Sequence, residues 1–280
     1  MTEFGLGDEL AAAWERNRDR LFESVRSVSE WIVNDVDPQP GATILELTAG
    51  PGETGFLAAE RVGSEGRLIS SDLSPGMVAA ARRGVEARGL SNVECRIIDA
   101  QAIDLPDSSV DGVLSRFGVM LVPEPPRVLA EARRVLRSGR RFAYAVWGPA
   151  ARNPWLTSLV AALLENGHVP PVVPDAGVGV FALADPEANH VLLVNAGFAH
   201  VRVQEITGAM DFVDIEDYFS LQSSVGGPIA PFVASLTSAQ RETIIASLGS
   251  ILEPFRREGG YQIPYHAIAA GGSSQTAPPS

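Results

Sequence analysis

The sequence contains no lysine, and all 22 of its basic residues are arginines. A Walker-type phosphate loop needs a lysine, and a Schiff-base mechanism needs an amine nucleophile. The absence of lysine therefore excludes both kinds of site. Cysteine is almost as scarce, because Cys95 is the only one, and no intramolecular disulfide can form. We interpret Cys95 as a buried structural thiol and see no indication of an oxidising compartment.

The sequence also has fewer basic than acidic residues and lacks long apolar runs. The 22 basic and 34 acidic residues give a formal net charge of -12, which disfavours binding to the phosphate backbone of a nucleic acid. No segment has the apolar length that crosses a bilayer, and the amino terminus lacks the basic start and apolar core of a signal peptide. These absences predict a cytoplasmic protein that binds no nucleic acid and makes no stable membrane association.

Short apolar runs alternate with segments of helical periodicity from about Thr43 to Trp147. Helix boundaries are marked by Ser74 and Pro75 at one start and by Gly89 at one end. Strands that alternate with helices predict an α/β fold with a parallel sheet covered on both faces.

The predicted organisation has four parts. N-terminal cap helices occupy residues 1–40, and the α/β core occupies residues 41–207 with a proline-rich lid insertion near residues 149–185. Residues 208–270 add further cap helices and a last strand. The composition of residues 271–280, GGSSQTAPPS, predicts a disordered tail.

The run LELTAGPGETG, residues 45–55, ends an apolar strand in a glycine-rich turn that leads into a helix. Gly50, Gly52 and Gly55 have the spacing of the dinucleotide fingerprint, and glycines let the backbone approach a ligand closely. Asp72, at the end of the second predicted strand, is placed to accept hydrogen bonds from two ribose hydroxyls. A nicotinamide dinucleotide and S-adenosylmethionine fit these features equally well.

Three further carboxylates favour a nucleoside that carries positive charge. Glu53 lies inside the turn, where it would repel the pyrophosphate of a dinucleotide. Glu46 adds a carboxylate that suits a sulfonium and an amino group. Asp99, at the end of the third predicted strand, could accept a hydrogen bond from the adenine amino group. Each of these acids could instead only cap a turn or bond neighbouring amides, and it is their combined spacing that favours the cofactor.

Four segments, LELTAGPGETG, SSDLSPGM, IIDAQAIDLP and EARRVLRSGRRFAYAVW, resemble in order and spacing the motifs of class I S-adenosylmethionine-dependent methyltransferases. The resemblance runs from about Trp14 to Val203 and is greatest to the ubiquinone and menaquinone biosynthesis subgroup and its small-molecule relatives. It implies a Rossmann-like, doubly wound, mostly parallel seven-stranded sheet with an antiparallel last strand and added cap helices. The cofactor-binding residues it implies are Glu46, Thr48, Gly50, Gly52, Asp72, Leu73, Met77, Asp99, Ala100 and Ser115.

Thr48 departs from this pattern, because the family has a glycine at its position. A β-branched residue tolerates positive φ badly, so we expect an extended backbone at Thr48. Its hydroxyl could bond the cofactor or have a purely structural role.

The methyl acceptor is expected beyond the ends of the fourth and fifth strands. Arg116 could orient an anionic or phenolic oxygen there, with an ion pair to Glu124 or Glu131 as the alternative. His168, in the proline-rich connection, is the candidate general base and lid residue. The candidate pocket residues, which could also be plain core, are Trp14, Phe117, Met120, Trp147 and Trp155.

These features predict methyl transfer from S-adenosylmethionine to an oxygen, carbon or nitrogen of a small, ring-containing metabolite, with S-adenosylhomocysteine as the other product. Specialised-metabolite biosynthesis is favoured over quinone biosynthesis, no metal is expected, and a homodimer is compatible with the sequence. The alternatives are an NAD-dependent oxidoreductase, which the missing lysine and tyrosine motifs disfavour, and a non-catalytic nucleoside-binding module.

Overall fold

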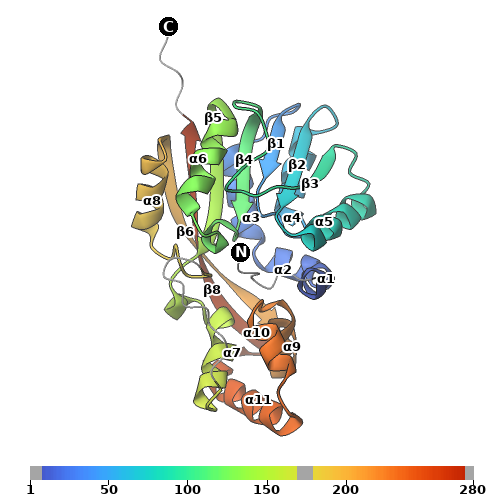
Figure 1. Cartoon of the computed structure of the whole chain (residues 1–280). Coiled ribbons are helices and arrows are strands. Elements are labelled where there is room, and N and C mark those ends of the chain that lie inside the picture. The colour runs from blue at the N-terminus through green and yellow to red at the C-terminus, as the bar shows by residue number, and fades with distance from the viewer. Residues whose placement is uncertain (1–7, 169–178, 275–280) are drawn as a thin grey trace.

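The computed structural model describes residues 8–168 and 179–274. It contains one large sheet whose two long C-terminal strands reach from the α/β core into a lobe made of helices (Figure 1). The strands are β1 (Thr43–Glu46), β2 (Arg67–Asp72), β3 (Val93–Ile97), β4 (Val110–Arg116), β5 (Leu136–Trp147), β6 (Phe198–Phe212), β7 (Arg256–Arg257) and β8 (Gly260–Ser274).

The strand order is β3-β2-β1-β4-β5-β8-β6, and the short β7 pairs with β8 off this path. Strands β1 to β5 pair in parallel, whereas β8 runs antiparallel to both β5 and β6. The predicted fold class, with its antiparallel last strand, is confirmed. The order reverses between β1 and β4, and in open α/β sheets ligands bind outside the carboxyl ends of the strands at such a switch point.

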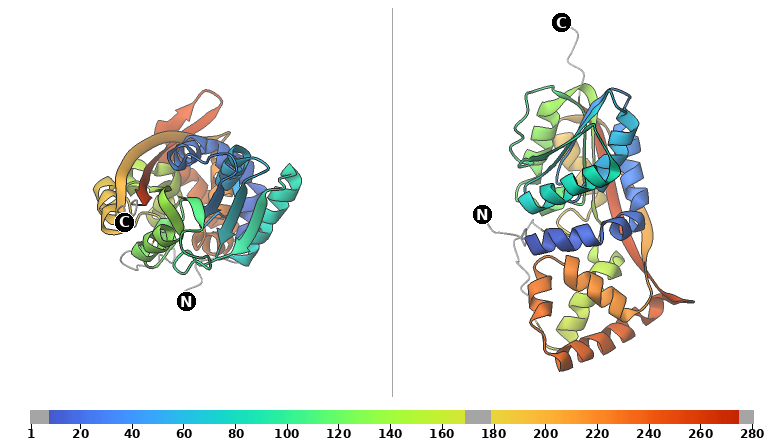
Figure 2. Two further views of the ribbon diagram at one scale, coloured as in Figure 1. Left: turned by 90° about the horizontal axis from the view of Figure 1, so that it is seen from above. Right: turned by 90° about the vertical axis from the view of Figure 1, so that its right-hand side faces the viewer.

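Two groups of helices lie outside the α/β core. Two short N-terminal helices, α1 and α2, lie between the sheet and the helical lobe, and α7, α9, α10 and α11 make up that lobe (Figures 1 and 2). The helices are α1 (Asp8–Arg16), α2 (Arg18–Ser24), α3 (Arg26–Val36), α4 (Glu53–Val62), α5 (Pro75–Arg88), α6 (Pro125–Val135), α7 (Pro154–Glu165), α8 (Pro186–Asn195), α9 (Ile215–Val225), α10 (Ile229–Ala234) and α11 (Ser238–Leu252), with 3₁₀ turns η1 (Val119–Leu121), η2 (Ala150–Arg152) and η3 (Glu253–Phe255).

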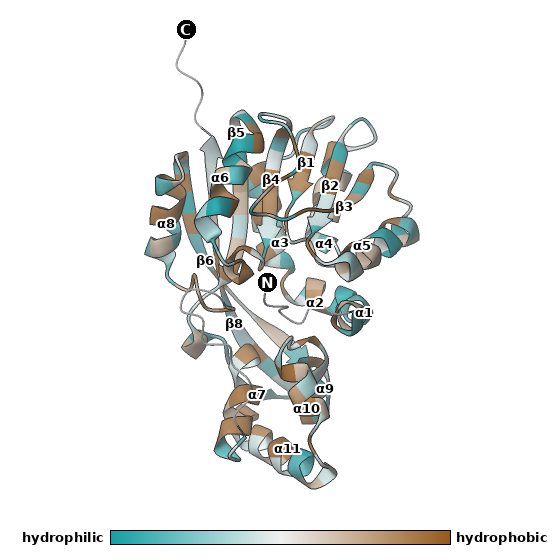
Figure 3. Cartoon of the chain, in the orientation of Figure 1, coloured by the Kyte–Doolittle hydropathy of each residue, from teal (hydrophilic) through white to brown (hydrophobic). Residues whose placement is uncertain are grey.

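The predicted punctuation of helix α5 is present. The hydroxyl of Ser74 accepts a hydrogen bond from the Met77 amide, Pro75 occupies the first turn, and Gly89 closes the helix with φ 64°. The central strands are buried, as the predicted apolar runs require, and their apolar residues colour brown within the core (Figure 3). Cys95 is only half-buried in the edge strand β3, so the prediction of a buried thiol is wrong.

The predicted boundaries at 207/208 and at 270/271 both fall inside long strands. The disordered tail predicted for 271–280 is wrong for residues 271–274, which complete β8. A Cβ on Gly271 would lie 2.3 Å from Asp35 Oδ2, so a small residue is needed there for packing. The glycine and serine composition therefore reflects close packing in this stretch, and residues 275–280 lie outside the described part.

The predicted lid insertion near 149–185 contains helix α7, which the sequence analysis did not identify. Most of its proline-rich connection, residues 169–178, lies outside the described residues. Within the described ranges, no helix has both the length and the apolarity to span a membrane.

Candidate cofactor and acceptor site

The glycine turn after β1 has a backbone that requires its glycines. Gly50 has φ 55° and Gly52 has φ 98°, both in the left-handed region that favours glycine. Gly52 is also the residue that precedes helix α4. The turn therefore follows the carboxyl end of β1 and leads directly into the amino terminus of a helix, the arrangement that the sequence predicted.

Thr48 also lies in the left-handed region, with φ 52°, so the prediction of an extended backbone at this position is wrong. The conformation is held by the Thr48 hydroxyl, which bonds the Leu47 carbonyl at 2.6 Å and the Ser115 hydroxyl at 2.7 Å. The absence of a side chain on Gly118 leaves room for Thr48. Strain of this kind costs about 1–3 kcal/mol and clusters at functional sites.

Asp72 joins the glycine turn to the start of helix α5. Its Oδ2 accepts a hydrogen bond from the Gly50 amide and its Oδ1 accepts one from the Ser74 amide, both at 2.9 Å. Burial raises the pKa of Asp72, and these amides oppose the rise. Each carboxylate oxygen can accept a second hydrogen bond, so Asp72 retains capacity for two ribose hydroxyls.

Glu46 lies beneath the turn, with a residue exposure of 1%. Its carboxyl oxygens accept hydrogen bonds from the Gly55 amide at 2.8 Å and from the Ser70 hydroxyl at 3.1 Å. A Cβ on Gly55 would lie 2.2 Å from Glu46 Oε2, so the third glycine of the fingerprint makes room for this carboxyl group. Burial raises the pKa of Glu46 to about 8. Direct contact of Glu46 with a ligand stays a prediction.

Glu53 is the first residue of α4 and is turned toward the N-terminal helices. Its Oε1 lies 3.5 Å from Arg18 Nε and has no hydrogen-bond partner in the described part of the chain. Arg18 also donates to the Ala80 carbonyl at 2.8 Å and so ties α2 to both α4 and α5. The sequence analysis did not identify Arg18, because nothing in its local pattern separates it from an exposed arginine.

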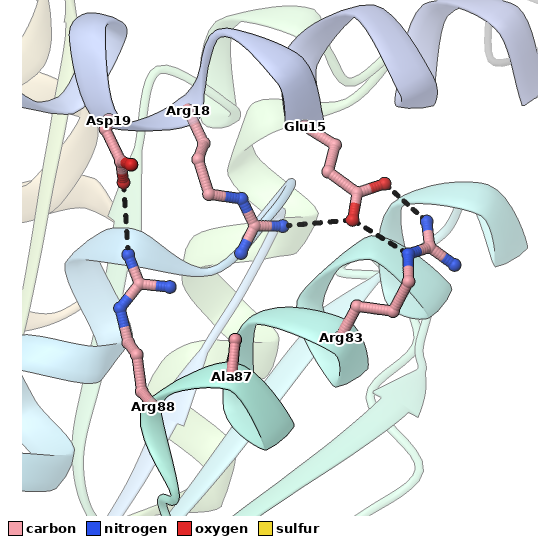
Figure 4. Close-up of a pocket in the computed structure, with 6 residues that line it drawn as sticks. All are labelled: Glu15, Arg18, Asp19, Arg83, Ala87 and Arg88. Carbon is pink, nitrogen blue, oxygen red and sulfur yellow. Dashed lines mark hydrogen bonds and ion pairs between the residues drawn. The ribbon is translucent and has the colours of Figure 1, made fainter.

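A pocket of about 480 Å³ lies between the N-terminal helices and helix α5 (Figure 4). Glu15 pairs with Arg83 at 2.5 Å, and Asp19 pairs with Arg88 at 3.4 Å. The pocket is therefore lined by ion pairs that attach α1 and α2 to α5. It does not include the glycine turn or the aromatic residues at the ends of β4 and β5.

The predicted adenine-binding residues lie near the ends of β2 and β3. Asp99 stands two residues beyond the end of β3, and its Oδ1 accepts a hydrogen bond from the Gln101 amide at 2.8 Å. Leu73 and Ile97 are 52% and 55% exposed, although both are large and apolar. Ile97 is the register partner of Asp72, which places an exposed apolar side chain that the sequence analysis missed at this edge. The other two predicted residues in this region, Met77 and Ala100, are both buried.

Aromatic side chains gather after β4 and β5. The rings of Phe117 and Trp147 stack with centroids 3.7 Å apart, and Trp147 meets Trp155 edge-on at 5.2 Å. Met120 Sδ accepts a hydrogen bond from the Trp147 amide at 3.4 Å. The structure thus brings four predicted pocket residues together and adds Tyr265, whose ring lies 5.9 Å from that of Trp147.

Arg116 ends β4 beside this aromatic group. Its guanidinium carbon lies 6.0 Å from the ring centre of Phe22 and 5.8 Å from that of Phe117. Glu131 pairs with Arg134 at 2.7 Å and Glu124 pairs with Arg127 at 3.4 Å, so the alternative ion pairs considered for Arg116 are not formed. Burial lowers the pKa of Arg116, and the carboxyl groups of Glu53 and Glu46 oppose this.

For Trp14 and His168, the other two predicted site residues, the contacts are with helices outside the glycine turn and the aromatic group. Trp14 is half-buried on α1, which packs against α5 and α9. His168 follows α7, and its ring meets that of Phe232 on α10 at 6.1 Å. A general-base role for His168 stays a prediction. Among the described residues, no group of three or more histidine, cysteine or acidic side chains could hold a metal ion.

Comparison of the sequence with known proteins finds similarity to methyltransferases. Residues 44–139 match the family model of a methyltransferase domain. The chain is 41% identical over 104 residues to an arsenite methyltransferase of Halobacterium salinarum, covering 37% of this chain but only 27% of that protein. It is 34% identical over 161 residues to the aklanonic acid methyltransferase DauC of a Streptomyces species, covering 54% of this chain and 71% of that protein.

The fold is shared with solved structures. The YcgJ protein of Bacillus subtilis superposes with a TM-score of 0.59 at 17% identity, over 90% of this chain and 100% of that one. At this identity, the likeness establishes the architecture and leaves the chemistry to the residues of the site.

Proposed function

The chain belongs to the family of S-adenosylmethionine-dependent methyltransferases, and from this premise we propose that it methylates an oxygen, carbon or nitrogen of a small, ring-containing metabolite. The relative named for aklanonic acid supports a small-molecule acceptor. The cofactor would be S-adenosylmethionine, and S-adenosylhomocysteine would be released.

The observation that carries the proposal is the fixed carboxylate of Asp72, which ends β2 beside the glycine turn. It is anchored by the amides of Gly50 and Ser74 and keeps capacity for two ribose hydroxyls. The exposed apolar side chains of Leu73 and Ile97 suit contact with an adenine ring. The proposed cofactor-binding residues are Glu46, Thr48, Gly50, Gly52, Asp72, Leu73, Met77, Asp99, Ala100 and Ser115.

The cofactor supplies a methyl group that its sulfonium has already activated. The chain then has to align the acceptor and exclude water, and no dedicated catalytic group is required. The aromatic group of Phe117, Trp147 and Trp155 would form the acceptor wall, with Trp14 and Met120 beside it. Arg116 would orient an acceptor oxygen, and His168 would be the general base where a neutral acceptor needs one.

The biological setting is part of the same proposal. We favour specialised-metabolite biosynthesis over quinone biosynthesis, a cytoplasmic location, and small-molecule rather than nucleic acid partners. The net charge of -12 supports the last point.

Thermal-shift titration is the first test. S-adenosylmethionine and S-adenosylhomocysteine are expected to raise the unfolding free energy, by about 2.7 kcal/mol at a hundredfold excess over Kd, whereas NADH should have no effect. Stabilisation by NADH alone would favour an oxidoreductase. Methyl transfer to a panel of phenols, indoles and quinols completes the test, since cofactor binding without turnover on any of them would favour a non-catalytic module.

A further inference from the structure

Arg116 differs from the other well-covered arginines in having no partner. Arg18 and Arg141, with side-chain exposures of 11% and 16%, pair with Glu53 and Asp35 respectively. Within the described part of the chain, the Arg116 side chain makes no ion pair and no hydrogen bond. Arg116 is half-buried, and a partly desolvated charge without a partner is unfavourable, so this arrangement points to an anion that arrives with a ligand.

The surroundings of Arg116 fit a flat ligand. The rings of Phe22 and Phe117 flank the guanidinium, which leaves its five N–H groups for oxygen atoms of a bound molecule. The carboxyl group of Glu53 favours the charged form of Arg116 without pairing with it, so the guanidinium donors stay free.

Trp155 provides a second donor without an acceptor. Its residue exposure is 4%, and its Nε1 has no hydrogen-bond partner in the described part of the chain. Its carbonyl accepts hydrogen bonds from the Tyr218 hydroxyl at 2.9 Å and the Gln222 amide group at 2.7 Å, so the backbone at this position is fixed. An orphaned indole N–H in a fixed position indicates an acceptor atom on a ligand.

The two orphaned donors belong to one continuous wall. Arg116 lies against Phe117, Phe117 stacks on Trp147, and Trp147 meets Trp155. Ring contacts therefore connect the two donors.

We propose, on the basis of the proposed function, that the methyl acceptor is a planar anion. Arg116 binds its carboxylate, enolate or phenolate oxygen, and Trp155 Nε1 donates to a carbonyl oxygen elsewhere on the same ring system. The anion supplies the electron pair for the new bond to the methyl carbon, and the electrons of the breaking carbon–sulfur bond stay on sulfur. No proton has to be removed during the transfer, so no general base is needed.

The test measures binding of three naphthalene probes by calorimetry in the presence of S-adenosylhomocysteine. The wild type is expected to bind 2-naphthoate at least tenfold more tightly than neutral 2-naphthamide, and 6-acetyl-2-naphthoate several-fold more tightly again. Arg116→Gln should remove the preference for the anion, and Arg116→Lys should keep part of it. Trp155→Phe, which retains a ring, should remove only the gain from the acetyl group.

Matched controls are Arg127→Gln on the exposed face of α6 and Trp31→Phe, which removes an indole N–H bonded to Gln204. Both should bind the probes like the wild type. Stabilisation by S-adenosylhomocysteine shows that each variant is folded. If S-adenosylhomocysteine does not stabilise the wild type, the proposed function is contradicted, and not only this inference. Equal binding of naphthoate and naphthamide, or no binding of any probe at millimolar concentration, would overturn the inference alone.

Discussion

Two arginines at opposite ends of the sheet show how this molecule separates stability from function. Arg141 lies opposite Gly112 near the start of β4 and makes a bidentate ion pair with Asp35, whose Oδ2 is 2.7 Å and 3.0 Å from two of its nitrogens. Arg116 ends the same strand β4, lies beside aromatic rings and makes no ion pair within the described part of the chain. Arg141 at the amino end is thus paired within the protein, whereas Arg116 at the carboxyl end keeps its donors free for a ligand.

The backbone shows a related difference. Thr48 and Phe117, which follow the carboxyl ends of β1 and β4, have φ of 52° and 58°. The strand residues of β1 and β4 themselves show no positive φ. Strain concentrated at the switch point is what a preorganised ligand site predicts.

The largest expected effect comes from exchanging the two arginines for methionine. Arg141→Met leaves buried Asp35 with only the exposed Arg202 as a partner, at 3.3 Å, so we expect a loss of about 3–5 kcal/mol in unfolding free energy by urea denaturation. Arg116→Met removes an unpaired charge and should be neutral or stabilising. Equal losses in the two variants would abolish the proposed difference between the ends of the sheet.

The second prediction concerns the strained turn. A Cβ on Gly118 would lie 1.7 Å from Thr48 Oγ1, so Gly118→Ala should destabilise the protein by about 3 kcal/mol. In a Thr48→Gly background the clash is absent, and the same change should cost under about 1 kcal/mol. A double-mutant cycle by urea unfolding measures this coupling, and additive effects would show that the Thr48–Gly118 contact does not hold the turn.

The third prediction tests the cofactor side of the functional end. Asp72→Asn keeps the shape but loses the charged acceptor for ribose hydroxyls, so the calorimetric Kd for S-adenosylhomocysteine should rise about 30-fold, or about 2 kcal/mol. The exposed carboxylate Asp104 offers the control Asp104→Asn, with no expected change. An unchanged Kd in Asp72→Asn would remove Asp72 from the site.

The smallest expected effect is the pH dependence due to Glu46. Its folded-state pKa of about 8 lies above the ordinary value of 4.5, so between these values the folded protein retains a proton that the unfolded chain loses. Stability from this group is therefore complete at low pH and falls as the pH rises toward 8. Relative to Glu46→Gln, the wild type should lose about 1 kcal/mol between about pH 7 and pH 8 in urea denaturation. A difference that is constant with pH would mean that Glu46 is already ionised.

Much of the α/β core was predictable because its signals are local. The apolar runs around Ile44 and Val113 and the cap at Ser74 each report on a few neighbouring residues. The serine and glycine stretch at 271–274 was misinterpreted because its need for small residues comes from Asp35 and Phe142, far away in sequence. Helix α7 was missed because its mostly apolar sequence lacks a clear polar face.

The candidate site also has features that the sequence predicts and features that it does not. Motif spacing was enough to predict that Glu46, Gly50 and Asp72 lie near the same edge of the sheet. It could not predict which atoms each side chain contacts. Glu46 is held by the Gly55 amide beneath the turn, which no spacing rule reveals. The left-handed Thr48 depends on Ser115 and Gly118 from another strand end, so its conformation contradicted its β-branched propensity.

The most direct test of the central claim is a crystal structure of the protein with S-adenosylhomocysteine, alongside a parallel soak with NADH. The account predicts that the ribose hydroxyls lie within hydrogen-bond distance of the Asp72 carboxylate, with the adenine between Leu73 and Ala100, and that NADH leaves the site empty. A diphosphate lying across Gly50 and Gly52, or an adenosyl group bound away from Asp72, would contradict it.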